Sequence, residues 1–338
     1  MDSATSTQAW QYTSPSGGVE RNLKQVTVAS PTPRPNQHLV EVLAASLNPA
    51  DYKPAETPVV GRFLVPNPAT PGADFAGRIV IPSASSDLKP GQMVFGNAGT
   101  SPFAGGALSQ LALVEEDHLA LLPNGISPVE GASVPVAGLT ALQSLVPYVK
   151  SGDRVFINGG SGGTGVFAIQ IAKTLGCHVT TTCSTANVEF CKSVGADVVI
   201  DYRKKDVLDA LSKYRFDHVV DNIGNDLAYY FQAHRYTTPE AVYVLVAKKT
   251  LRSALCSNMI RSSLPTLLGG GQRTLVNMMS TSSQRELDMM AAWMKEGKVK
   301  AIIDSTYTFD QVPTALTKLK LGRARGKIVI KVNDAATD

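Results

Sequence analysis

A glycine-rich turn between an apolar run and a helical segment constrains this chain more than any other feature. Residues 153–158 (DRVFIN) predict a buried strand, and residues 166–175 predict a helix that is apolar on nearly every face. Between them, five of the seven residues 159–165 are glycine, in the order GGSGGTG. The pattern G-x-G-x-x-G carries information here because strand, turn and helix together form the phosphate-binding corner of a βαβ unit.

Each glycine of the pattern has a physical role. Gly160 permits the tight turn, Gly162 lets a pyrophosphate approach the backbone, and Gly165 lets the helix pack closely on the strand. The N–H groups at the start of the helix then hold the phosphates. A turn without a ligand is the alternative, but so many glycines would weaken a purely structural turn through their conformational entropy. We therefore expect a bound dinucleotide.

The end of the second strand, residues 178–183, indicates which dinucleotide. An NAD site usually places Asp or Glu about 20 residues after the first glycine. Here residues 182–187 (TCSTAN) offer hydroxyls, and the first carboxylate is Glu189 in the next helix. This favours NADP(H). The window holds no Arg or Lys, so Arg203, beside Tyr202, either supplies the charge for a 2′-phosphate or is an ordinary loop residue.

The rest of the chain divides into three zones. Short β-type runs punctuated by Pro and Gly predict a small mainly-β domain over residues 1–125. Strands alternating with helices predict a parallel sheet over residues 126–270. A return segment over residues 271–338 begins with a helix capped by Ser283 and Glu286. The strands expected outside the glycine turn are 38–43, 77–81, 93–95, 108–114, 178–183, 198–200, 218–220, 242–246 and 327–332.

Composition excludes several classes of protein. The 338 residues are 43% hydrophobic, which is too apolar for a disordered chain, and the formal net charge of +4 is spread too thinly for a nucleic-acid footprint. No apolar stretch is long enough to span a membrane, and the start MDSATSTQ lacks the regions of a signal peptide. The four cysteines form no C-x-x-C pair, and the spacing of Cys and His makes a zinc site improbable. We expect a cytoplasmic protein.

The residues around the turn resemble those of a known family. The run 152–176 (GDRVFINGGSGGTGVFAIQIAKTLG) is similar to the cofactor turn of the zinc-independent medium-chain dehydrogenase/reductases, in their quinone oxidoreductase branch. Eight further segments match in order, so that the resemblance covers roughly residues 8 to 332. They are SLNPADYK (46–53), TPGADFAG (70–77), GQMVFG (91–96), GGALSQ (105–110), VAGLTAL (136–142), VGADVVIDY (194–202), DNIG (221–224) and GRARGKIVI (322–330).

The resemblance implies an α/β protein with a GroES-like, mainly-β catalytic domain and an inserted Rossmann domain, a doubly wound parallel sheet. It implies an NADPH-dependent enzyme that transfers hydride to quinones or to the C=C bond of α,β-unsaturated carbonyls, where the cofactor carries the chemistry. The alternatives are an enoyl reductase dedicated to one pathway of fungal polyketide-type metabolism, or a catalytically silent NADPH-binding scaffold of the zeta-crystallin kind. The segment GGGQR (269–273) is similar to a fungal or mitochondrial enone-reductase subgroup.

Zinc can be tested by position against the same family. The alcohol dehydrogenase branch would have Cys near Asn48, and Gly-His-Glu where this chain has Gly72-Ala73-Asp74. Both are missing, as is the four-cysteine lobe, so we expect no metal. The partners expected are a small-molecule carbonyl or quinone substrate, no nucleic acid, no membrane, and a homodimer as a possible assembly.

The resemblance assigns the catalytic site to the loop that faces the nicotinamide in this family. Asn48 could hold the substrate or the cofactor amide, and Tyr52 could donate a hydrogen bond to the acceptor oxygen as enolate charge develops. Lys53 could polarise a carbonyl, and Asp74 is expected to anchor the loop. The alternatives are a turn at Asn48, packing for Tyr52 and a solvated Lys53.

The resemblance also implies the contacts with the cofactor. Thr140 is expected beside the nicotinamide, and Ser184 and Tyr202 at the adenosine 2′-phosphate. Ala186 stands where relatives often carry Arg or Lys, which weakens the preference for NADPH over NADH. Lys327 either reaches the phosphates or merely opens the last strand. The full expected set is Thr140, Gly160, Ser161, Gly162, Gly163, Thr164, Gly165, Ser184, Tyr202, Asn222, Leu245, Val246, Ala247 and Lys327.

Overall fold

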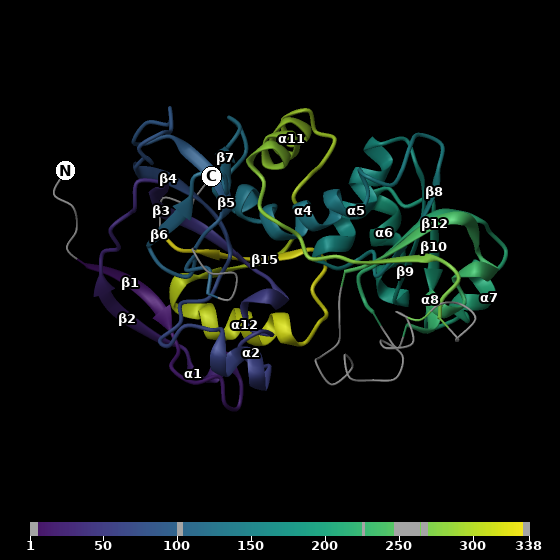
Figure 1. Cartoon of the computed structure of the whole chain (residues 1–338), viewed down its shortest axis with the longest axis horizontal. Coiled ribbons are helices and arrows are strands. Elements are labelled where there is room, and N and C mark those ends of the chain that lie inside the picture. Colours follow the sequence, from purple (N-terminus) through teal and green to yellow (C-terminus); the bar gives the residue numbers. More distant parts are fainter. Residues whose placement is uncertain (1–5, 100–103, 225–226, 247–263, 265–269, 334–338) are drawn as a thin grey trace. The chain divides into compact units, whose positions relative to one another are not determined.

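The computed structural model describes residues 6–99, 104–224, 227–246, 264 and 270–333 (Figure 1). The chain divides into two compact units, the first made of residues 1–139 with 282–338 and the second of residues 140–281. Both boundaries lie later in the chain than the limits expected at 125 and 270. The helix α4 (Pro135–Gln143) contains the first boundary.

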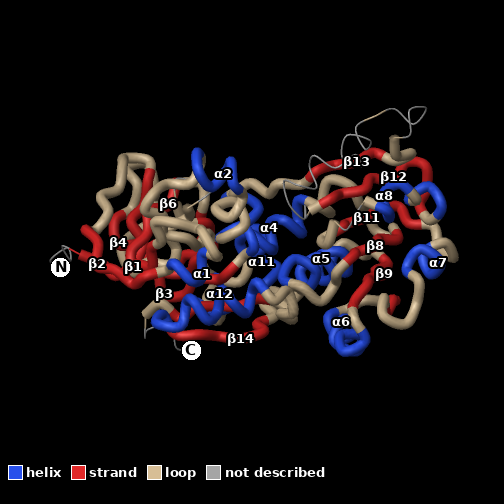
Figure 2. The backbone as a smooth tube through the Cα atoms, turned by 90° about the horizontal axis from the view of Figure 1, so that it is seen from below, coloured by secondary structure: helices blue, strands red, loops and turns tan. Residues whose placement is uncertain are grey.

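The first unit is mainly β-structure. The hairpin of β1 (Ser6–Gln11) and β2 (Lys24–Ala29) precedes a seven-stranded sheet, whose strands are red in Figure 2. Its order is β14-β15-β3-β4-β5-β7, with β6 paired to β3. The remaining strands are β3 (Gln37–Leu47), β4 (Asp74–Ile81), β5 (Met93–Asn97), β6 (Leu111–Glu115), β7 (Leu119–Leu121), β14 (Ile303–Thr308) and β15 (Lys327–Lys331).

The long strand β3 organises this sheet. Ten of its eleven residues are buried, and it pairs antiparallel with β4, β6 and β15. The register sets Ile328 of β15 opposite Leu47, so the C-terminal strand returns beside the end of β3. The helical segments of this unit are α1 (Val19–Asn22), η1 (Pro49–Asp51), α2 (Pro58–Phe63), α3 (Pro128–Ala132), α11 (Gln284–Lys295), η5 (Phe309–Gln311) and α12 (Val312–Lys320).

The second unit is a doubly wound parallel sheet. Its six strands lie in the order β10-β9-β8-β11-β12-β13, which in chain order is 3-2-1-4-5-6, and every neighbouring pair is parallel. Ligands of such sheets bind at the carboxyl ends of the strands where the order reverses, here between β8 and β11. The strands are β8 (Arg154–Asn158), β9 (His178–Cys183), β10 (Val198–Asp201), β11 (Phe216–Asp221), β12 (Thr237–Leu245) and β13 (Thr274–Asn277).

The burial of the helix after β8 accounts for its unusually apolar sequence. In α5 (Gly163–Thr174) eight consecutive residues, 165–172, are buried, and Figure 2 shows the helix beside β8 and β9. A helix buried nearly all round needs the apolar composition that predicted it. Among the described residues of this unit, the other helical segments are η2 (Thr185–Asn187), α6 (Val188–Val194), α7 (Val207–Leu211), α8 (Ala228–Phe231) and η3 (Ala233–Arg235).

Most of the expected elements are present. The Ser283 side chain accepts a hydrogen bond from the Glu286 backbone N–H at the start of α11, which confirms Ser283 as the predicted N-cap. The hairpin β1–β2, the edge strands β13 and β14, and the helix α12 were not predicted. No helix among the described residues is both long enough and apolar enough to cross a membrane.

Candidate active site

The glycine turn follows β8 directly, and two of its glycines are required by packing. A Cβ on Gly160 would lie 2.1 Å from Thr181 Oγ1, and a Cβ on Gly165 would lie 2.2 Å from the Gly159 carbonyl oxygen. Thr181 Oγ1 cannot easily move because it donates to the Ile157 carbonyl at 2.7 Å. The absence of a side chain at Gly160 and Gly165 therefore allows β9 and α5 to pack against the turn.

Gly162 differs from the other two. It is the N-cap of α5 in extended backbone, and the nearest heavy atom to a Cβ placed there would be the Gly159 carbonyl oxygen at 3.9 Å. The space that a side chain would fill lies next to the first amides of α5, which have no acceptor within the helix. A phosphate group fits this cradle because it needs close approach to such amides.

Asn222 supplies a second sign of a ligand. It follows β11, and its backbone N–H donates to the Asn158 carbonyl at 3.2 Å, so it lies beside the carboxyl end of β8. Both Oδ1 and Nδ2 of Asn222 are buried and have no hydrogen-bond partner among the described residues. An unpaired buried amide costs about 1–3 kcal/mol, so its partner is expected to be a bound molecule. The donor and acceptor fit a dinucleotide.

Hydroxyl and amide groups join the turn to the end of β9. Thr182 Oγ1 donates to Asn158 Oδ1 at 2.6 Å and accepts from the Gly159 N–H at 2.9 Å. Ser161 Oγ accepts from Asn187 Nδ2 at 3.0 Å, which leaves the Ser161 hydroxyl proton to donate. The hydroxyl of Thr182 is therefore used inside the fold, whereas that of Ser161 keeps its proton for a further hydrogen bond.

The residues expected at the 2′-phosphate come from neighbouring strands. Asp201 of β10 pairs with Cys183 of β9, and the Tyr202 N–H donates to the Cys183 carbonyl at 3.2 Å. Ser184, which follows β9, and Tyr202, which follows β10, are thereby neighbours at one edge of the sheet. Tyr202 is 51% exposed. Arg203 comes next in the chain.

Three further expected cofactor residues, Thr140, Leu245 and Val246, lie elsewhere in the second unit. Thr140 is buried and donates to Ser280 Oγ at 3.0 Å. Leu245 ends β12, and the Val246 N–H donates to the Asp221 carbonyl at 2.9 Å. Ala247 lies outside the described residues.

In the first unit, Asn48 is held from three sides. It follows β3, and its backbone N–H donates to Asp51 Oδ2 at 2.7 Å. Its Nδ2 donates to Asp74 Oδ2 at 2.7 Å, and its Oδ1 accepts from Lys327 Nζ at 2.6 Å. With only 3% of its surface exposed, Asn48 is a buried link rather than a free side chain.

Asp74 holds the same cluster from β4. Its Oδ1 accepts from Asn97 Nδ2 at 3.1 Å and from the Val136 N–H at 2.8 Å, while Lys327 Nζ lies 3.3 Å from Oδ2. These contacts agree with an anchoring role. Lys327 was expected among the cofactor contacts and Asn48 in the catalytic loop. The structure brings these two residues into contact within the first unit.

Burial governs the protonation of this cluster. Desolvation raises the pKa of Asp51 to about 7, against the hydrogen bonds that it accepts from the Asn48 and Ala73 backbones. Desolvation also raises the pKa of Asp74, and the neighbouring Lys327 ammonium opposes that rise. Burial therefore favours the protonated form of both carboxyl groups, and at Asp74 the neighbouring ammonium opposes this effect.

Tyr52 and Lys53 follow the cluster on the same loop. Tyr52 is half-buried, Lys320 Nζ lies 5.1 Å from its ring centroid, and burial raises the pKa of its hydroxyl. Lys53 is exposed, and partial desolvation of its ammonium lowers its pKa. The Lys53 N–H donates to the Pro49 carbonyl at 3.0 Å. At neutral pH the Tyr52 hydroxyl can therefore act as a neutral hydrogen-bond donor, and the Lys53 ammonium as a cationic one.

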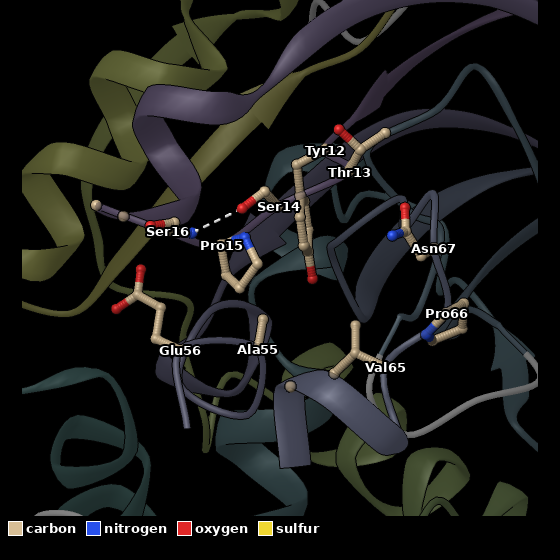
Figure 3. Close-up of a pocket in the computed structure, with 13 residues that line it drawn as sticks. Tyr12, Thr13, Ser14, Pro15, Ser16, Ala55, Glu56, Val65, Pro66 and Asn67 are labelled. Carbon is tan, nitrogen blue, oxygen red and sulfur yellow. Dashed lines mark hydrogen bonds between the residues drawn. The ribbon is translucent and has the colours of Figure 1, made fainter. Parts of the chain in front are cut away.

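A separate pocket of about 550 Å³ opens in the first unit (Figure 3). Tyr12, Ala55, Val65 and Asn67 line it, and the Tyr12 ring points into it. The Tyr12 hydroxyl is buried without a hydrogen-bond partner among the described residues, and desolvation raises its pKa to about 12. None of the residues expected at the site lines this pocket.

Sequence reasoning missed Asp51 and Asn97 as members of the buried cluster. Asp51 stands inside the quoted segment SLNPADYK, three residues after Asn48, and that N-cap spacing was the available signal. For Asn97 no local pattern pointed to Asp74. Among the described residues, no group of three or more His, Cys, Asp or Glu side chains could hold a metal ion.

Comparison with known proteins agrees with this geometry. Residues 34–124 match the alcohol dehydrogenase GroES-like domain, and residues 194–330 match the zinc-binding dehydrogenase family. The chain is 44% identical to the trans-enoyl reductase pgmF of Aspergillus terreus, over 98% of either chain. It is 31% identical to the chloroplast envelope quinone oxidoreductase homolog of Arabidopsis thaliana, over 96% of this chain and 98% of the relative.

Solved structures show the same fold. The quinone oxidoreductase from Coxiella burnetii superposes with a TM-score of 0.85 and 31% identity, covering 97% of this chain and all of that one. The GroES-like match, the parallel nucleotide-binding sheet and the full-length relatives confirm the resemblance noted in the sequence. The chain is an oxidoreductase of the medium-chain dehydrogenase/reductase family, in the branch of the quinone oxidoreductases and enoyl reductases.

Proposed function

We propose that this chain transfers hydride from NADPH to a quinone or to the C=C bond of an α,β-unsaturated carbonyl compound. The observation that carries the proposal is the unpaired, buried amide of Asn222 together with the open cradle at Gly162. These two features at the carboxyl ends of β8 and β11 are suited to a dinucleotide. The full-length similarity to an enoyl reductase and to quinone oxidoreductases supports the acceptor class.

NADPH rather than NADH is supported by the groups after β9 and β10. Ser184 and Tyr202 offer hydroxyls, and Arg203 to Lys205 form a turn whose Lys204 and Lys205 amides donate to the Asp201 carbonyl at 3.1 and 3.0 Å. Three cationic residues directly after Tyr202 suit a phosphate monoester better than a bare ribose. The Asp201 carboxylate accepts from the Arg203 N–H at 3.0 Å and is thereby engaged within this turn.

In the proposed mechanism the nicotinamide, when bound, supplies the hydride, and the chain provides binding, orientation and hydrogen bonds. The glycine turn, with Ser161 and Thr164, holds the pyrophosphate. Negative charge develops on the carbonyl oxygen of the acceptor as its β-carbon is reduced. Tyr52 or Lys53 donates a hydrogen bond to that oxygen, and the α-carbon then takes up a proton from water.

An enoyl reductase dedicated to one biosynthetic pathway is the second candidate. It is favoured by the 44% identity to the trans-enoyl reductase pgmF over nearly the whole chain. Both candidates share the cofactor and the direction of hydride transfer, and they differ in the acceptor.

The three described cysteines are free and buried, which suits the reducing, cytoplasmic location that we propose. The homodimer is proposed on the resemblance alone, and light scattering tests it.

The deciding experiment follows NADPH oxidation against simple quinones, alkenals and enoyl thioesters. Turnover of several quinones or alkenals supports the broad reductase, while turnover confined to enoyl thioesters supports the pathway enzyme. Tight NADPH binding with turnover of none of them overturns both and leaves a cofactor-binding scaffold. Equal use of NADH contradicts the assignment of the 2′-phosphate contacts.

A further inference from the structure

The buried cluster joins the ends of three strands that are far apart in the sequence. Asn48 follows β3, Asp74 begins β4, and Lys327 begins β15. Lys327 is 3% exposed although it carries a long cationic side chain. Buried cations are rare unless paired, so the surroundings of this ammonium must compensate for its lost hydration.

The surroundings do so with three acceptors. Lys327 Nζ lies 3.2 Å from the Leu47 carbonyl oxygen, 2.6 Å from Asn48 Oδ1 and 3.3 Å from Asp74 Oδ2. An ammonium group has three donors, so its capacity is filled inside the first unit. A cofactor phosphate could be bound by this group only if one of these contacts were given up.

The same contacts determine how the Asn48 amide is oriented. Its Oδ1 faces the ammonium and its Nδ2 faces the Asp74 carboxylate, so the amide cannot rotate by half a turn without placing like groups together. Asp51 then fixes the Asn48 backbone, and the Lys53 N–H returns to the Pro49 carbonyl. The chain from Asn48 to Lys53 is therefore held in one conformation from its first residue.

We infer that Lys327 is a positioning residue: together with Asp74 it clamps Asn48 and so sets the conformation of the loop that carries Tyr52 and Lys53, and it does not bind the phosphates of the cofactor. This inference rests on the proposed function for the role of Tyr52 and Lys53. The clamp itself consists of contacts within one unit and can be tested separately.

The test compares three variants. Lys327→Met removes the cation, but it leaves the buried Asp74 carboxylate unpaired and can prevent folding. Lys327→Met combined with Asp74→Asn removes both charges and keeps the fold accessible. Lys318→Met is the matched control, since it breaks a partly exposed ion pair of 2.6 Å with Asp304 in the same unit.

For the double variant we expect kcat with saturating NADPH to fall on the order of 100-fold, as when reacting groups are misplaced by about 1 Å. The Kd for NADPH should stay within about twofold of the wild type. Backbone amides of residues 48–56 should exchange hydrogen faster, and Lys318→Met should change none of these quantities. A tenfold rise in the NADPH Kd with unchanged kcat would overturn the inference in favour of a phosphate contact.

Failure of the proposed function is distinguishable from failure of this inference. If the wild type reduces no acceptor, hydrogen exchange alone decides. Faster exchange over residues 48–56 in the double variant then supports the clamp, and wild-type exchange overturns it. In both cases the measurements use the full chain.

Discussion

The substitution Gly162→Val isolates the cofactor cradle from the stability of the fold. Gly162 has φ −82° and ψ 174°, a conformation open to any residue, and the nearest atom to its Cβ would be 3.9 Å away. The loss of a tolerable N-cap costs up to about 1 kcal/mol, and the lower entropy of the unfolded chain returns about 0.4–1 kcal/mol. We therefore expect the free energy of unfolding to change by less than about 1 kcal/mol.

Binding should change far more. The valine side chain would fill the space from which a pyrophosphate reaches the first amides of α5. Each hydrogen bond between such an amide and a charged oxygen contributes about 1.5–3 kcal/mol. Losing two of these hydrogen bonds costs about 3–6 kcal/mol, which raises the Kd for NADPH by roughly 100-fold or more. Calorimetric titration with NADPH measures this directly.

Gly160→Ala and Gly165→Ala provide the contrast. Their Cβ atoms would lie 2.1 Å from Thr181 Oγ1 and 2.2 Å from the Gly159 carbonyl oxygen, so each should lower the free energy of unfolding by about 1–3 kcal/mol. Chemical denaturation separates the two effects. Wild-type NADPH affinity in a folded Gly162→Val protein would show that the turn does not hold the pyrophosphate.

Three further predictions concern specificity, catalysis and pH. Arg203→Ala should weaken NADPH binding about tenfold and leave NADH binding unchanged; equal losses for both would remove the phosphate contact from this residue. Tyr52→Phe should lower kcat about 10- to 100-fold if the hydroxyl donates to the developing enolate, and unchanged steady-state kinetics would contradict that role. Burial raises the pKa of Asp51 from 3.8 to about 7. Between these pH values the folded state binds more protons than the unfolded state. The contribution of Asp51 to the free energy of unfolding therefore falls by up to about 4 kcal/mol as pH rises from about 4 to 7. Relative to the wild type, Asp51→Asn should therefore become more stable between pH 5 and pH 8 in urea denaturation, and a constant difference would refute the raised pKa.

Local patterns were sufficient for the elements that build the cofactor domain. The run before the glycine turn is β8, the apolar run after it is α5, and the expected strands at 178–183, 198–200 and 218–220 are β9, β10 and β11. Periodicity and turn chemistry act between near neighbours, so they can be seen in one sequence. The edge strands β13 and β14 were missed because their short, half-exposed runs carry a weak pattern.

The glycine turn between β8 and α5, the family and the absence of the usual zinc ligands at Asn48 and Ala73 follow from the sequence alone. The contacts of Lys327, by contrast, depend on how the whole unit packs. Its ammonium meets Asn48 across 279 positions and Asp74 across 253, because the pairing of β15 and β4 with β3 brings three strand ends together. The register of a sheet depends on packing throughout the unit, and no local pattern encodes which strand ends will meet. The same holds for Gly160 and Gly162, whose different surroundings appear only once β9 lies against the turn.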